Sequence, residues 1–276
     1  MKEQWWRIAF GSSDGVRLVV APGDHLGAAI GVAAVRLGKR GEVWPLAAAP
    51  ATPGEVPLGE SVGKGVVVER DTPHERLGTF RPPSGIVAAL DDGPRPSVMS
   101  GFAERVADEA LVIEAVAEGT DARERFLEVV ERLPIVDNVE VQIADHYDDG
   151  TTTDVWLTPR LRDTRRALRF LDDFDVELLR NGHVDVAVYV REPRSTWRLT
   201  QHKSLVWMTV DETLHGKVRG WLESAGLERR DPLETIADRG HHHYRAATSS
   251  ARLKLGVRLT KAGLRKVDTL PRDGAS

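Results

Sequence analysis

The second half of the chain repeats one order of hydrophobic patterns, two strands and then a helix, and this order restricts the fold more than any other feature. The order runs over residues 137–181 and again over residues 183–226. In the strands apolar side chains alternate with period two, whereas in the helices they recur at i, i+3, i+4 and i+7. Short turns between the strands require antiparallel pairing, and each helix then covers one face of the sheet. The sequence therefore predicts an α+β protein with antiparallel sheets covered by helices on one face.

The first 98 residues are predicted to form a smaller α+β unit with proline-rich connections. They hold ten of the fifteen prolines, most of them clustered in residues 44–60 and 81–96. Because proline lacks an amide proton and fixes φ, these clusters are not expected to contain helices or central strands. The other patterns of this unit predict a third strand–strand–helix repeat and one further short strand, over residues 5–22, 24–38 and 65–70.

Residues 99–276 are predicted to form the larger domain. It is expected to open with a helix over residues 100–109 and a strand over 110–119, and residues 195–211 are expected to form one strand. From Arg245 onward the chain carries eight Lys and Arg against two Asp. The larger domain therefore ends in a basic segment, while the residues before Arg245 are acidic overall.

Composition excludes several classes of protein. The chain has no cysteine, so disulfides, thiol catalysis and cysteine-ligated metals are excluded. A formal net charge of −4 argues against a general nucleic-acid partner, and no glycine-rich phosphate loop follows a strand. The smoothest apolar stretch, Leu26 to Val35, is too short to span a bilayer, and the first residues lack the apolar core of a signal peptide. We therefore expect a cytoplasmic protein with no membrane partner.

Three consecutive histidines, in the segment GHHHYR at residues 240–245, are the first candidate for chemistry. If the segment is extended, His241 and His243 point to one side and His242 to the other. Two imidazoles at this spacing can hold a metal ion, but a site needs one or two further ligands. The alternative is a polar strand without a ligand.

A second metal hypothesis begins at His146 and Asp148, which match the H-x-D part of a two-histidine, one-carboxylate iron site. His202, His241 or His243 would supply the third ligand, and Arg252 would pair with the carboxylate of a 2-oxoacid. This predicts an oxygenase of the Fe(II)/2-oxoglutarate kind, with Fe or Zn as cofactor. Against it, oxygenases of that kind are built almost wholly of strands, and YDDGTTT is typical of a hairpin turn.

The segment RLTKAGLRKV, at residues 258–267, suggests a third class of function. It is similar to the segment that follows the wing of winged-helix domains, where a strand ends and a helix starts. A DNA-binding regulator is therefore a second alternative.

Large aromatic side chains on predicted strands are the remaining signal. They favour a sheet core, but an antiparallel sheet with one open face or edge also suits the addition of an extended peptide. In that interpretation aromatic and charged side chains of the open surface select the peptide. The side chains we predict to contact it are Trp156, Tyr189, Trp197, Arg198, His202 and Trp207.

The segment NGHVDVAVYVREPRSTWRLTQHKSLVWMTVDE, at residues 181–212, followed by an amphipathic helix, resembles the homologous peptide-binding proteins of the crocagin pathway. The resemblance covers roughly residues 137–226. It implies a protein that binds a ribosomally made precursor peptide while a pyrroloindoline-type core is formed, beside separate peptide-modifying enzymes. It also implies an accessory binding role without a cofactor of its own. This is the leading functional hypothesis from the sequence.

Overall fold

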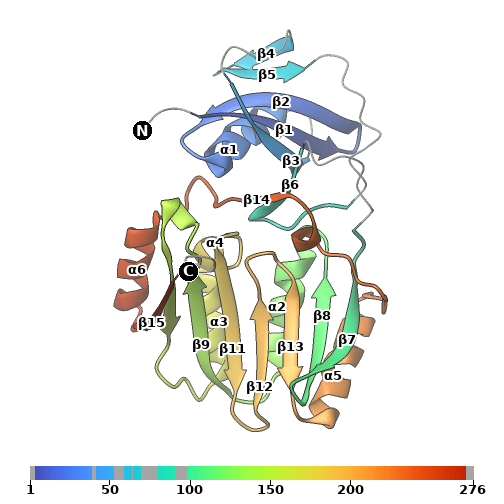
Figure 1. The fold of residues 1–276 in the computed structure, drawn as a ribbon, viewed down its shortest axis with the longest axis vertical. Helices are drawn as coiled ribbons and strands as arrows, with labels where there is room; N and C mark the ends of the chain where they lie inside the picture. Colours follow the sequence, from blue (N-terminus) through green and yellow to red (C-terminus); the bar gives the residue numbers. More distant parts are fainter. Residues whose placement is uncertain are drawn as a thin grey trace.

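The structure is a computed structural model that describes residues 4–38, 42–52, 59–63, 65–69, 80–90 and 98–271. The described residues form two sheets, one above the other in Figure 1, with helices packed against each. All neighbouring strands are antiparallel except for one pair in the smaller sheet. The predicted α+β class is confirmed.

The smaller sheet has seven strands in the order β14-β6-β3-β1-β2-β5-β4. Helix α1 (Leu26–Leu37) packs on one face, where Ala29 and Ala33 are fully buried. These small side chains let the helix backbone approach the strands closely. The strands are β1 (Gln4–Ser12), β2 (Gly15–Gly23), β3 (Val43–Ala51), β4 (Gly59–Gly63), β5 (Val66–Glu69), β6 (Ile86–Ala89) and β14 (His241–His243).

The larger sheet has eight antiparallel strands in the order β15-β10-β9-β11-β12-β13-β8-β7. They are β7 (Gly101–Ala107), β8 (Ala110–Val116), β9 (Val136–Ile143), β10 (Thr152–Leu157), β11 (Val184–Val190), β12 (Ser195–Leu199), β13 (Leu205–Thr209) and β15 (Arg265–Pro271). The helices of this part are α2 (Asp121–Arg132), α3 (Thr164–Asp173), α4 (Asp175–Leu178), α5 (Glu212–Ser224) and α6 (Arg252–Lys261).

One face of the larger sheet is covered and the other is not. Figure 1 looks onto the uncovered face, and helices α2, α3 and α5 lie behind the strands. The covered face holds the core, in which Trp197 and Trp207 are fully buried together with Phe126. The alternate strand residues, such as Tyr189 and Arg198, lie on the uncovered face and are partly exposed. The predicted one-sided covering is therefore present in the larger sheet.

The predicted helix over residues 100–109 is wrong, because this segment is strand β7 and the beginning of a tight turn. Asp108 and Glu109 have φ angles of 48° and 65°. Two consecutive residues with positive φ make the two-residue turn that suits a β-hairpin. This turn folds β7 back onto β8, with Ala107 opposite Ala110.

The proline clusters do contain strands, which contradicts the expectation from the sequence. Strand β3 includes Pro45 and Pro50 and lies between β1 and β6. Its pairing with β6 covers only Ala47 and Ala48. The prolines lie outside this doubly paired part, so their missing amide protons interrupt no ladder on the β6 side.

Two further expectations fail in the larger domain. Residues 195–211 form two strands, β12 and β13, so the second repeat has three strands before its helix. At the C-terminal end helix α6 precedes strand β15, the reverse of the strand-then-helix order on which the winged-helix similarity rested. That similarity is not present in the structure.

Strand β14 connects the two sheets. It follows the larger sheet in sequence but pairs with β6, with His241 opposite Ala88 and His243 opposite Ile86. All strands of the smaller sheet except β14 therefore come before residue 98, and all strands of the larger sheet come after it. Among the described residues no helix is both long and apolar enough to cross a bilayer.

Candidate metal centre

Five histidines from four segments gather where β14 meets the ends of the larger sheet's strands. The ring centroids of His202 lie 4.9 Å from His241 and 5.0 Å from His243, and the ring of His146 lies 4.6 Å from His243. Strand β14 is the edge strand of the smaller sheet, lies toward the larger sheet in Figure 1, and carries two of these histidines. The five are His146 after β9, His183 before β11, His202 in the β12–β13 turn, and His241 and His243 on β14.

Because β14 is extended, its three histidine side chains alternate between the two sides of the strand, as predicted. His241 and His243 point to the same side, with their Nε2 atoms 3.1 Å apart. His242 points to the other side, where its ring meets the edge of Trp6 at 5.9 Å between centroids. Only the two outer histidines of the segment therefore belong to the cluster.

Hydrogen bonds to backbone carbonyls fix which nitrogen of each ring carries the proton. Nδ1 of His241 lies 2.6 Å from the carbonyl oxygen of Arg239, and Nδ1 of His243 contacts the carbonyl oxygen of Gly182. Because a carbonyl only accepts, both Nδ1 atoms donate their protons to it. In the neutral rings the two Nε2 atoms then carry lone pairs that face each other.

Two facing lone pairs at 3.1 Å repel each other unless a proton or a metal ion lies between them. In a tetrahedral zinc site with Zn–N bonds of about 2.0–2.1 Å, neighbouring nitrogens lie about 3.3–3.4 Å apart. Metal-bound histidines also commonly donate the second ring N–H to a carbonyl or carboxylate. The His241–His243 pair has both features.

His202 completes a group of three. One ligand nitrogen each from His202, His241 and His243 can be chosen so that all lie within 4.8 Å of one another. All three side chains are partly buried, so the group is held by the fold but not sealed inside it. Small side-chain rotations bring such a set to the spacing of a metal site.

Burial keeps two of these rings neutral. Burial, together with the neighbouring imidazoles, lowers the pKa of His243 to about 2. The same causes lower the pKa of His202 to about 4. Neutral rings have the lone pair that a metal ion needs.

His146 and His183 form a second layer around His243. The centroid of the His183 ring lies 4.9 Å from that of His146 and 5.9 Å from that of His243. Burial, followed by the nearby His146, lowers the pKa of His183 to about 3. Its Nδ1 atom is buried without a hydrogen-bond partner among the described residues. A water molecule or an ion could satisfy a buried nitrogen of this kind.

Asp148 is not part of this cluster, which corrects the H-x-D hypothesis. One of its carboxylate oxygens accepts a hydrogen bond of 2.9 Å from the backbone of Arg252, and the other lies 3.4 Å from Arg245. The side chain of Arg252 pairs with Asp154 at 3.1 Å, and its guanidinium donates to backbone carbonyls such as that of Ala144. The guanidinium group of Arg252 therefore binds groups of the protein itself and does not face a cosubstrate. His146, in contrast, lies in the cluster as predicted.

The residues predicted to contact a peptide are divided by the structure. Trp197 and Trp207 are 0% exposed, and Trp156 lies against Gly256 of α6, so these three side chains belong to the core. Tyr189 and Arg198 lie on the uncovered face, where the Tyr189 hydroxyl donates to Glu140 at 2.9 Å. His202 lies in the histidine cluster.

A polar hollow of about 390 Å³ lies on the uncovered side, next to the histidines in sequence and in space. It is lined by Asp145, which contacts Nδ1 of His146 at 3.3 Å, and by Gln201, which precedes His202. Asp185 also lines it, and burial raises the pKa of this carboxyl. A small polar molecule in this hollow would lie beside the metal centre.

Sequence reasoning did not include His183 in any site. The residue immediately precedes β11, and no spacing rule relates it to the segment that carries His241 and His243. Comparison with protein-family models, curated proteins and solved structures finds no match for this chain.

Proposed function

We propose that the protein binds a divalent transition-metal ion through His202, His241 and His243. The facing Nε2 atoms of His241 and His243, with both Nδ1 protons held by backbone carbonyls, are the observation that supports this most strongly. His202 adds a third imidazole within reach. The rings of His146 and His183 pack beside that of His243, at 4.6 Å and 5.9 Å between centroids.

Zinc is the ion that this donor set favours. Imidazole nitrogens suit zinc, copper, nickel and iron, whereas magnesium and calcium require oxygen ligands. With Asp148 outside the cluster, the two-histidine, one-carboxylate set typical of iron oxygenases is not formed. Three protein ligands leave a fourth position for water or substrate, as in catalytic zinc sites. We therefore propose a metal-dependent activity on a small polar molecule in the adjoining hollow.

The test is metal binding by untagged protein, because an affinity tag of histidines would bind metal itself. Titration with Zn²⁺ against a chromophoric chelator, and with Co²⁺ by absorption spectroscopy, is expected to give one equivalent. The Co²⁺ form is expected to show the intense visible bands of four-coordinate geometry. His241→Gln and His243→Gln are each expected to weaken zinc binding about a hundredfold or more.

His242→Gln is the matched control, because it changes a histidine of the same strand that points away from the cluster. It is expected to leave the stoichiometry and the cobalt spectrum unchanged. Equal loss of affinity in all three variants would contradict a defined site. So would the absence of stoichiometric binding of Zn²⁺, Co²⁺, Ni²⁺ and Cu²⁺ by the unaltered protein.

Peptide binding is a second candidate function, supported by the uncovered face of the larger sheet. Tyr189 lines a hollow of about 370 Å³ there together with Leu157 and Arg194. The edge strand β15 is exposed along its whole length, so an extended peptide has both a surface and a backbone ladder to use. In line with the sequence resemblance, we propose that this peptide is a ribosomally made precursor, held during formation of a pyrroloindoline-type core.

Calorimetric titration of the protein with a peptide encoded by a neighbouring gene tests this second function. Tyr189→Ala is expected to weaken binding about tenfold or more, because aromatic side chains often dominate the energy of an interface. Val106→Ala, which changes a 71% exposed side chain of β7 at the opposite edge of the sheet, is the control. No heat at high micromolar peptide concentration would count against peptide binding and would leave the metal centre unaffected.

A further inference from the structure

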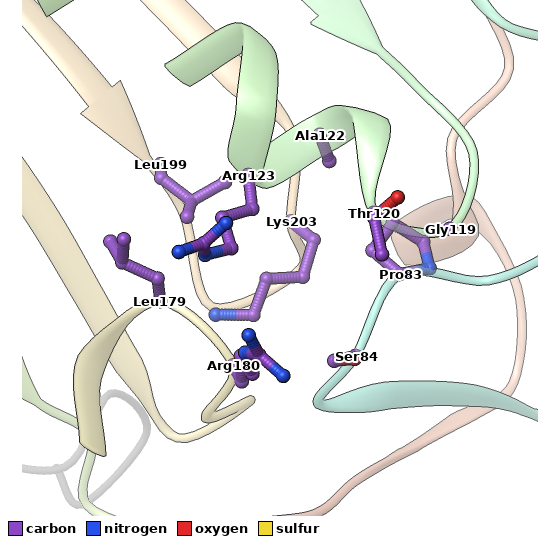
Figure 2. A pocket seen from close by; sticks show the side chains of 10 residues that line it. All are labelled: Pro83, Ser84, Gly119, Thr120, Ala122, Arg123, Leu179, Arg180, Leu199 and Lys203. Atoms are coloured by element: carbon purple, nitrogen blue, oxygen red, sulfur yellow. The ribbon is translucent and has the colours of Figure 1, made fainter. Parts of the chain in front are cut away.

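A small cavity separate from the metal centre lies beside the first turn of α2 (Figure 2). Its volume is about 40 Å³. Since a bound water needs about 10–15 Å³ on the same measure, the cavity has room for a few waters or one small anion. The lining residues are Pro83, Ser84, Gly119, Thr120, Ala122, Arg123, Leu179, Arg180, Leu199 and Lys203.

The lining is strongly positive. It contains Arg123, Arg180 and Lys203 and no carboxylate. In Figure 2 the ammonium group of Lys203 lies between the guanidinium groups of the two arginines. Asp175, outside the lining, pairs with Arg180 at 2.7 Å and also with Arg123. Asp175 therefore bridges the two arginines, and the side chains that line the cavity itself remain positive.

Lys203 is the least expected member of this group. Lys203 is only 2% exposed, and its ammonium group donates a hydrogen bond of 2.7 Å to the carbonyl oxygen of Asn181. Its φ of 61° lies in the left-handed region, which is uncommon for a residue other than glycine. A buried lysine usually pairs with a carboxylate, whereas within the described part of the chain Lys203 forms no ion pair and Asp185 acts on it only from a distance.

The beginning of α2 adds to the positive field. Thr120, the N-cap residue, forms no capping hydrogen bond with its side chain. The first amide groups of a helix lack partners within the helix, and the helix dipole makes this end positive. Among these amides, that of Asp121 donates to the carbonyl oxygen of Glu118 at 2.9 Å, and the acidic side chains of Asp121 and Glu124 in the same turn offset part of this field. Thr120 and Arg123 line the cavity from this end of the helix.

We infer that this cavity binds a dianionic phosphate group, either as inorganic phosphate or as the phosphate of a small monoester. Three basic side chains around one small space offer more donors than a single carboxylate can use, and a phosphate group has more acceptor oxygens to pair with them. Guanidinium and ammonium groups form short, charge-assisted hydrogen bonds to phosphate oxygens. The side chain of Arg180 is 48% exposed, so the cavity meets solvent on that side and the rest of a monoester can extend outward there.

The experiment is calorimetric titration of the full-length protein with inorganic phosphate and, separately, with O-phosphoserine. Acetate at matched ionic strength serves as the monoanion comparison. Arg180→Gln removes a partly exposed cation of the cavity and is expected to weaken phosphate binding about tenfold or more. Arg219→Gln is the matched control, because Arg219 is similarly exposed, at 46%, and pairs with Glu104 on α5's side of the molecule. It is expected to leave phosphate affinity unchanged.

Tighter binding of O-phosphoserine than of inorganic phosphate would identify a monoester as the ligand class, and the reverse would identify free phosphate. Equal effects of Arg180→Gln and Arg219→Gln would overturn the inference, because they would indicate general screening of charge. Equal affinity for acetate, or no binding at tens of millimolar phosphate, would overturn it as well. None of these outcomes depends on the histidine ligands, so the metal proposal is tested separately.

Discussion

Asp137, at the start of β9, is a carboxylate whose charge two arginines stabilise. Its side chain is 8% exposed and accepts hydrogen bonds from Arg160 and, at 2.9 Å, from Arg191. Burial acts to raise the pKa of Asp137, but the hydrogen bonds and charges of the two arginines lower it overall. The pairing joins β9 to the segments that follow β10 and β11.

Asp137→Asn is therefore expected to lower the melting temperature at pH 7 and to have a smaller effect at pH 3. A carboxyl group whose pKa is lower in the folded state stabilises that state at pH values above its unfolded pKa. This stabilisation is lost as the pH falls through the folded pKa. Thermal unfolding at both pH values measures the difference, with the exposed Glu42→Gln as control. An effect of Asp137→Asn that is the same at both pH values would contradict this role of the charge.

At the scale of single side chains, the sequence predicted which residues alternate but not which face is covered. Val184, Val186, Val188 and Val190 share one face as predicted, and that face is the core. Trp197 lies opposite Val188 in the paired strand and is buried with it. Pairing register depends on contacts between strands, which the pattern of one strand does not contain. This is why a core tryptophan was predicted to contact a peptide.

Helix α6 shows how an element can be fixed by a few contacts with distant residues. Its apolar side is short, with Leu255 and Leu259 buried. Ahead of it, Ser250 donates from its backbone and its hydroxyl to Glu177, at 2.9 Å each. Glu177 is 4% exposed and also pairs with Arg258 of α6. Sequence patterns did not predict this helix, because its apolar side is short and its contacts with Glu177 come from another element of the chain.

Glu177→Gln is expected to destabilise the protein by about 1.5–3 kcal/mol, because it weakens charged hydrogen bonds in a buried place. Chemical denaturation measures this free energy of unfolding. Glu228→Gln is the control, since Glu228 is 78% exposed in its pair with Arg230. Exposed pairs of this kind contribute about 0–1 kcal/mol. Similar losses in the two variants would show that Glu177 is not a special anchor of α6.

Across the whole molecule, the two sheets meet at a pair of glycines. A Cβ atom on Gly182 would lie 1.8 Å from the carbonyl oxygen of Gly85, so the backbones touch where any side chain would separate them. The amide of Gly182 donates to Tyr244 at 3.0 Å, and the carbonyl of Gly85 accepts from Tyr244 at 2.8 Å. The same junction includes the contact between His243 and Gly182.

Gly182→Ala is therefore expected to weaken zinc binding about tenfold or more, although every histidine ligand remains. The added methyl group pushes the backbones apart and displaces the residue-182 carbonyl that accepts the Nδ1 proton of His243. Gly220→Ala, in α5, is the control, because no atom lies within 4 Å of the added group. It is expected to leave zinc affinity unchanged and to stabilise the helix by up to about 1 kcal/mol. Unchanged zinc affinity in Gly182→Ala would show that the junction does not shape the metal centre.

The sequence predicted the separate strands of both sheets better than their assembly. It indicated that His241 and His243 share a side, but not that their strand crosses to the smaller sheet. Strand β7 was missed because its apolar positions also fit a helical period, and the choice was made by the turn at Asp108 and Glu109. The metal centre unites residues whose contacts depend on the complete fold, so only part of it was predicted.

The return of β14 to the smaller sheet has a consequence for biosynthesis. Strands β1 to β6 leave the ribosome long before residues 241–243 are translated. Until then, the edge of β6 that pairs with β14 in the complete fold has no partner strand. Unpaired sheet edges attract other chains, and distant pairings form late. A nascent chain that stops before β14 would therefore expose this edge and lack two of the three proposed ligands, so incomplete copies would be both prone to aggregation and unable to hold the ion.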